Sequence, residues 1–114
     1  MHYTKRATAL SLMRDALPAL KVTVDRVRRE DRDLGNQMRR AAQSVLLNLA
    51  EADGNRGGNR RLRIETALGS LRETREALHI AAAWGYVEAA AAEELDRLLD
   101  RAAAMSWRRL QRAR

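Results

Sequence analysis

Residues 34–63 have the sequence LGNQMRRAAQSVLLNLAEADGNRGGNRRLR, in which an amphipathic helix is followed by a glycine-rich turn. Apolar residues recur every three or four positions, which is the spacing of one face of an α-helix. These positions are Leu34, Met38, Ala41, Val45, Leu49 and Ala52. Three of the six glycines lie between 54 and 58, and helix-forming sequence resumes after them. The segment therefore predicts helices over 33–53 and 59–84, with Asn59 as the N-cap of the second.

The same spacing continues on both sides of this segment. It predicts a helix over 6–30, in which Pro18 is expected to cause a kink, and a helix over 88–111. Gly85 is expected in the left-handed conformation that ends the helix before it. The expected core positions outside 33–53 are Leu10, Met13, Leu17, Leu20, Val24, Val27, Ile64, Leu68, Leu71, Leu78, Ala82, Ala91, Leu95, Leu98, Ala102 and Met105. Four such helices with short connections predict one all-α domain over 1–114, an antiparallel up-down four-helix bundle.

The composition of this bundle suggests self-association. Of the apolar residues 21 are alanine, and phenylalanine is absent, so the core of a single chain is thin. Leu46 and Leu47 lie beside the core stripe and are expected to contact other subunits, although a single exposed leucine is common and needs no explanation. The absence of cysteine excludes thiol chemistry and disulfides. With no long apolar run, a soluble, cytoplasmic protein of bacterial type without a membrane role is expected.

Positive charge is the second feature of the sequence. The net charge is +7, and 20 of the 22 basic residues are arginine. Residues 101–114 contain five arginines and no acidic residue. Such a chain favours a polyanionic partner such as RNA or DNA. The alternative is that the arginines only keep the surface solvated.

The glycine-rich turn does not match a nucleotide-binding loop, since no Gly-Lys-Ser/Thr follows the glycines and no strand precedes them. Arg60, Arg61 and Arg63 are expected in the first turn of the helix over 59–84, where the helix dipole disfavours cations. Arginines beside exposed amides are suited to bind a phosphate or another anion. Exposed arginines at a helix start also cost little, so a solvated surface is again the alternative.

No catalytic or metal site is predicted. Glu76 and His79 form one Glu-x-x-His unit of the kind that binds di-iron centres in pairs, but the only other histidine is His2. Arg75 lies near the predicted core, where it is expected to pair with a carboxylate such as Glu51 or Glu76 rather than bind an anionic metabolite. Trp84 and Tyr86 flank Gly85 and are expected to cover the end of the bundle, with base stacking as the alternative. No cofactor is expected.

Four motifs carry a resemblance to a known family. QMRRAAQS at 37–44 is followed by NLAE at 48–51, ALGSLRE at 67–73 and GY at 85–86. With these motifs the chain resembles the four-helix-bundle proteins encoded by intervening sequences in 23S rRNA genes, which include the accessory variability determinant of diversity-generating retroelements. The resemblance implies a homopentamer without catalytic activity. In the retroelement member it implies binding of nucleic acid and a reverse transcriptase. Ala52 departs from the pattern, because it replaces a glycine.

Two sets of functional residues follow. The polar residues expected to hydrogen-bond between the second and third helices are Asn48, Glu51, Ser70 and Glu73. Gly69, in the middle of a helix, suggests a close approach of helices there. The arginines expected to bind nucleic acid through phosphates are Arg39, Arg40, Arg56, Arg60, Arg61, Arg63, Arg108, Arg109 and Arg112. The alternative function is an oligomeric protein–protein scaffold with an acidic protein partner.

Overall fold

The computed structural model describes residues 6–112, which form four α-helices. Helix α1 spans Ala9–Glu30, α2 Arg32–Gly54, α3 Gly58–Ala83 and α4 Ala89–Arg112. No strand occurs among these residues, so the prediction of an all-α chain with four helices is confirmed. His2 lies outside the described residues. Between residues 6 and 112, no helix has the length and apolar character needed to cross a membrane.

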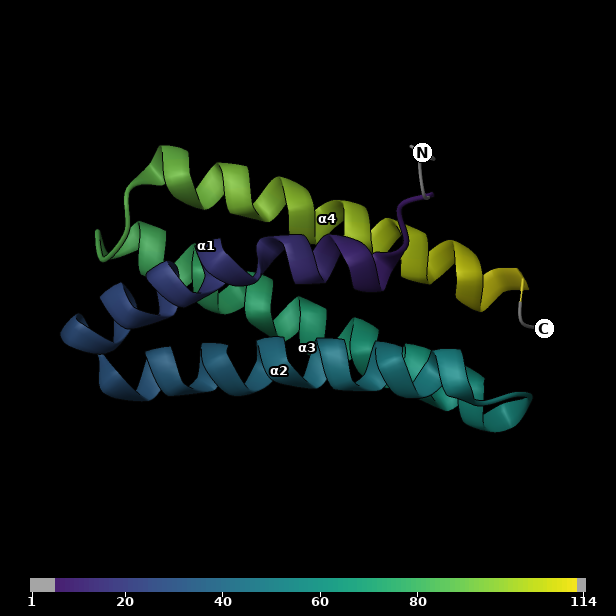
Figure 1. Cartoon of the computed structure of the whole chain (residues 1–114). Coiled ribbons are helices and arrows are strands. Elements are labelled where there is room, and N and C mark those ends of the chain that lie inside the picture. Colours follow the sequence, from purple (N-terminus) through teal and green to yellow (C-terminus); the bar gives the residue numbers. More distant parts are fainter. Residues whose placement is uncertain (1–5, 113–114) are drawn as a thin grey trace.

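The helices form a bundle in which each helix packs against two others. Helix α1 contacts α2 and α4, and α3 contacts the same two helices. Figure 1 shows the α1–α2 and α3–α4 connections at one end of the bundle, and the α2–α3 turn with the end of α4 at the other. The Cα atoms extend 42 × 36 × 18 Å, so the bundle is thin in one direction. The arginine-rich α2–α3 turn and the arginine-rich end of α4 therefore come to the same end.

Hydrogen-bonded caps set the first two helix boundaries. Thr8 forms a capping box with Ser11, so α1 begins at Ala9 rather than near residue 6. One residue, Asp31, joins α1 to α2. Its backbone amide donates to the Val27 carbonyl at 2.7 Å, and its side chain accepts from the amide of Leu34 at 3.0 Å. Asp31 therefore ends one helix and begins the next.

Glycines set the two remaining turns. Helix α3 begins after Gly57, with φ 65°, so the prediction that Asn59 is its N-cap is wrong. Gly85 has φ 77°, which confirms its predicted left-handed conformation. The Tyr86 and Gly85 amides donate to the carbonyls of Ala81 and Ala82, as in a Schellman motif. Tyr86 packs on the core, whereas Trp84 is 72% exposed and does not cover the bundle end.

The core follows the predicted stripe closely in α2 and less closely elsewhere. All six stripe positions of α2 are buried. In α1, Leu17 is exposed instead of buried, and Ala9, Leu12 and Ala16 lie inside. Pro18 stays within one continuous helix, and α1 changes direction near its middle (Figure 1). In α4, Leu95 and Ala102 are buried as predicted, whereas Ala91 is exposed, Leu98 and Met105 are half-buried, and the other buried positions are Ala92, Leu99, Ser106 and Leu110.

Gly69 is not a site of close helix approach within the chain. It is exposed, and a Cβ atom built there meets no other atom within 4 Å. Since glycine in a helix interior is less favourable than alanine, Gly69→Ala should raise the free energy of unfolding by about 0.5–1 kcal/mol. Chemical denaturation checks this value. A loss of stability would show that something outside this chain packs against Gly69.

Candidate nucleic-acid interface

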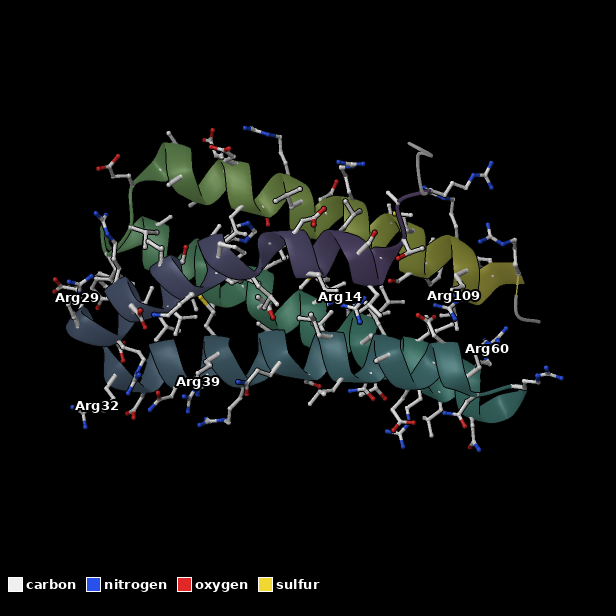
Figure 2. The ribbon with its side chains drawn as sticks, in the orientation of Figure 1. Arg14, Arg29, Arg32, Arg39, Arg60 and Arg109 are labelled. Carbon is white, nitrogen blue, oxygen red and sulfur yellow. The ribbon has the colours of Figure 1, made fainter. Side chains whose placement is uncertain are left out.

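The end of the bundle formed by the α2–α3 turn and the last turns of α4 is strongly basic. Ala52 of α2, Ile64 of α3 and Leu110 of α4 pack together there, which holds the three segments in place. Figure 2 shows Arg60 and Arg109 at this end, and the segment before α1 reaches the same region. We call this region the basic end and define it by its arginines: Arg6, Arg56, Arg60, Arg61, Arg63, Arg108, Arg109 and Arg112. Two groups that are far apart in sequence thus lie at the same end of the molecule.

Arg60 has a structural role at this end. Its Nε donates to the carbonyl oxygens of Ala52 at 3.2 Å and Asn55 at 2.9 Å. The last carbonyls of a helix lack intrahelical donors and carry the negative end of the dipole, so a cation is favourable there. Arg60 is at the start of α3 in sequence, but its guanidinium acts on the end of α2. The sequence did not reveal this because the chain reverses at Gly57.

Substitutions of Arg60 and of its neighbour Arg61 should therefore differ in their effects on the free energy of unfolding. Arg60→Gln should lower the free energy of unfolding by about 1–2 kcal/mol, since two carbonyls lose a charged donor. Arg61→Gln makes the same charge change without a hydrogen bond to lose, and should stay within about 0.5 kcal/mol of wild type. Urea denaturation of the two variants is the test. Equal stabilities would contradict a capping role for Arg60.

A polar cluster joins α2 and α3 next to the basic end. The hydroxyls of Ser44 and Ser70 are 2.7 Å apart, and the side chain of Asn48 donates to both the carbonyl and the hydroxyl of Ser44. Arg63 donates from Nη1 to the Asn48 Oδ1 at 3.3 Å. Of the four residues predicted to form this network, Asn48 and Ser70 thus lie within it. Ser44 was not among the predicted network residues, although it stands in the QMRRAAQS motif.

The other two residues predicted for the network lie outside it. Glu51 is exposed and accepts a hydrogen bond from Asn55, four residues later in the chain, at 3.1 Å. Glu73 is exposed, and no hydrogen bond of its side chain to another residue in 6–112 is found. Both residues therefore face solvent on α2 and α3 rather than joining these helices.

Among the six remaining arginines of the basic end, Arg109 differs from the other five. Arg109 pairs with Asp53 at 2.8 Å, which links α4 to the end of α2. Within residues 6–112 the side chains of Arg6, Arg56, Arg61, Arg108 and Arg112 have no ion pair or hydrogen bond, and all but Arg61 are exposed. Free guanidinium groups are well suited to bind the phosphates of nucleic acids.

Arg39 and Arg40 are not part of the basic end. Arg39 precedes Gly54 by 15 residues (54 minus 39), which is about 22 Å along α2. Figure 2 shows Arg39 toward the opposite end, where Arg29 and Arg32 also lie. Arg28, Arg29 and Arg32 also belong to this second basic area and were not among the predicted residues, although the segment RREDRD at 28–33 contains all three. The nine predicted arginines thus divide between two regions.

Arg75 is held by two carboxylates of α4. Its Nε and Nη2 donate to Asp96 at 2.8 and 3.0 Å, and Asp100 lies 3.2 Å from Nη1. The prediction of a carboxylate partner is confirmed, but Glu51 and Glu76 are the wrong ones. The hydrogen bonds from Arg75 lower the pKa of Asp96 below its ordinary value. Because Arg75 is neutralised in this way, it does not offer a free charge to an anionic metabolite.

This ion pair predicts a loss of stability in acid. Since the folded-state pKa of Asp96 is depressed, the stability it contributes is present above the unfolded pKa of about 3.9 and is lost as the pH falls through the lower folded value. Asp96→Asn should lower the free energy of unfolding at pH 7 by about 1–2 kcal/mol. The variant should then lose less stability than wild type between pH 5 and pH 2. Parallel acid profiles of the two proteins would contradict this assignment.

The other candidate sites are weaker. His79 lies 3.6 Å from Glu76 and 3.8 Å from Asp96, and residues 6–112 contain no group of three or more side chains placed to hold a metal ion. Leu46 is half-buried against the core, whereas Leu47 is 68% exposed. Leu47 is therefore the more accessible of the two predicted subunit contacts.

Comparison with known proteins supports one family. The model of the 23S rRNA-intervening sequence protein family matches residues 13–108, which span all but the outer turns of the bundle. No curated protein and no solved structure matches the chain. The family match confirms the relationship predicted from the motifs in α2 and α3. The chain belongs to the 23S rRNA-intervening sequence protein family.

Proposed function

We propose that this protein is a non-enzymatic, cytoplasmic nucleic-acid-binding bundle that contacts phosphates through its basic end. The observation that carries the proposal is the convergence of free arginines from the α2–α3 turn and α4 on one end of the molecule. Five arginines of this end have neither an ion pair nor a hydrogen bond within residues 6–112, and the only carboxylate paired there is that of Asp53. Phosphates attract such a surface independently of base sequence.

Assembly into an antiparallel, up-down bundle that forms a homopentamer is the second part of the proposal. Three exposed apolar side chains support self-association, since large apolar groups at the surface favour contact with another chain: Leu47 at 68%, Leu62 at 57% and Val22 at 61% exposure. Light scattering is the test. A mass near five times the chain mass of 12.9 kDa is expected, and a monomer would contradict the assembly.

Binding is tested by fluorescence anisotropy with labelled duplex RNA and duplex DNA across a series of salt concentrations. The expected result is measurable affinity at 50 mM salt that falls steeply with added salt and depends little on base sequence, because released counterions drive phosphate contacts. Few aromatic residues are available to stack on bases, so no strong preference for single strands is expected.

A competition experiment distinguishes nucleic-acid binding from the rival function, which is a scaffold for an acidic protein. Poly-glutamate carries negative charge without phosphates, so it should displace nucleic acid only at a large excess of charge. Displacement at equal charge would favour an acidic protein partner. No binding to either nucleic acid at low salt would contradict the proposed function.

A further inference from the structure

A cavity of about 470 Å³ lies between the start of α1, the end of α2 and the last turns of α4. Four arginines line it: Arg6 before α1, and Arg108, Arg109 and Arg112 of α4. Leu10 and Met105 contribute an apolar part of the wall. Its volume falls in the range of ligand sites, which are concave and combine apolar walls with a few polar groups.

The charge of this cavity is unbalanced. Asp53 is the one carboxylate of residues 6–112 among its lining side chains, and it is already bound to Arg109 at 2.8 Å. Four arginines minus one aspartate leave a charge of +3 at the cavity. The three arginines other than Arg109 have no ion pair within residues 6–112. A bound anion would therefore gain several charged donors without breaking an existing pair.

The first turn of α1 also borders this cavity. The first four amides of a helix lack intrahelical acceptors, and the capping box of α1 satisfies those of Thr8 and Ser11. The amides of Ala9 and Leu10 belong to the same set, and both residues line the cavity. The first turn of α1 contains no acidic side chain that would compete with an anion.

We propose that this cavity binds a terminal phosphate monoester together with the nucleotide that carries it. A monoester carries nearly two negative charges at neutral pH, whereas an internal phosphodiester carries one, so the excess of arginine favours the end of a chain. Leu10 and Met105 provide an apolar surface for the sugar or base. A free nucleoside monophosphate has the same chemistry as the phosphorylated end of a nucleic acid. Recognition of a nucleic-acid end rests on the proposed function, while binding of a free nucleotide does not.

The test compares two duplex RNA hairpins that differ only in a 5′-phosphate or a 5′-hydroxyl. Wild type should bind the phosphorylated hairpin about tenfold more tightly, the gain from one or two charged hydrogen bonds. Arg108→Gln with Arg112→Gln should reduce this ratio to about one, since both side chains are exposed on the cavity wall. Arg97→Gln with Arg101→Gln makes the same charge change on exposed positions of α4 and should keep the ratio.

Each outcome of this test has a distinct meaning. Equal binding of both hairpins by wild type overturns the end-binding site and leaves the proposed function intact. A ratio that both double variants reduce equally shows a general charge effect and also overturns the site. If neither hairpin binds, the proposed function is contradicted. Calorimetric titration with a nucleoside monophosphate then tests whether the cavity binds a free nucleotide. Nucleotide binding by wild type that is lost only in the Arg108/Arg112 variant supports the cavity as a phosphate site. No nucleotide binding by wild type overturns it.

Discussion

Replacing Gly35 with leucine should lower the free energy of unfolding by about 3 kcal/mol. Gly35 is buried in the first turn of α2, where α1 passes next to it. A Cβ atom at this position would lie 2.8 Å from the backbone nitrogen of Arg28 and 2.9 Å from its Cα, and would also collide with the Arg28 side chain. The side chain can move away, but the α1 backbone cannot move without opening the one-residue connection at Asp31. Chemical denaturation measures the loss.

Two glycine variants control this prediction. Gly35→Ala should also destabilise the protein, by about 2 kcal/mol. The free-energy cost of the overlap with the Arg28 backbone exceeds the gain of about 1 kcal/mol in helix propensity. Gly69→Ala makes the same change at an open helical position and should have the opposite sign. If the free energy of unfolding of Gly35→Leu is within about 0.5 kcal/mol of the wild-type value, the close approach of α1 and α2 is contradicted.

The second large effect is expected at the basic end. A variant with Arg56, Arg61, Arg108 and Arg112 changed to glutamine should bind duplex DNA about a hundredfold more weakly at 50 mM salt. Its plot of log affinity against log salt should be shallower by about 3.6, since each lost phosphate contact removes about 0.9 from the slope. Arg60 is kept because its removal would destabilise α2. Anisotropy titrations at several salt concentrations give both values.

A matched variant distinguishes the effect of where the arginines lie from the effect of the lost net charge. Arg14, Arg26, Arg97 and Arg101 are exposed and lie outside the basic end, and changing them to glutamine gives the same net charge. This variant should keep most of the affinity and nearly the wild-type slope. Equal losses in the two variants would show that binding depends on total charge rather than on the convergence of α2, α3 and α4.

The sequence predicted the helices well because their apolar spacing leaves few alternatives. In α2 one stripe of larger residues is unambiguous, and it is buried as predicted. In α4, alanine and leucine occupy several adjacent positions, so two overlapping faces that share Leu95 and Ala102 match almost equally well. The face with Ala92, Leu99 and Ser106 is buried, although Ser106 is polar. Its hydroxyl donates to the Ala102 carbonyl at 2.8 Å, a bond within the helix that spacing does not reveal.

The partners of the arginines could not be predicted from local spacing. Arg75 bonds to Asp96, which is 21 residues later, and Arg60 bonds to carbonyls at and just after the end of the preceding helix. Both contacts depend on how the chain reverses, at Gly85 and at Gly57. The sequence identified the α2–α3 turn and the end of α4 as basic, whereas the structure separates an arginine that caps a helix from arginines that are free. The sequence therefore predicted which segments of the candidate site carry positive charge, but not which arginines are free or which segments lie together.

The measurement that most directly tests binding at the basic end is an NMR titration of isotope-labelled protein with duplex RNA. Amide signals of residues 55–63 and 105–112 should shift first and most, because these segments surround the free arginines of the basic end. Signals from the α3–α4 connection at the opposite end of the bundle should change little. Shifts confined to that connection, or spread evenly over all four helices, would contradict the account.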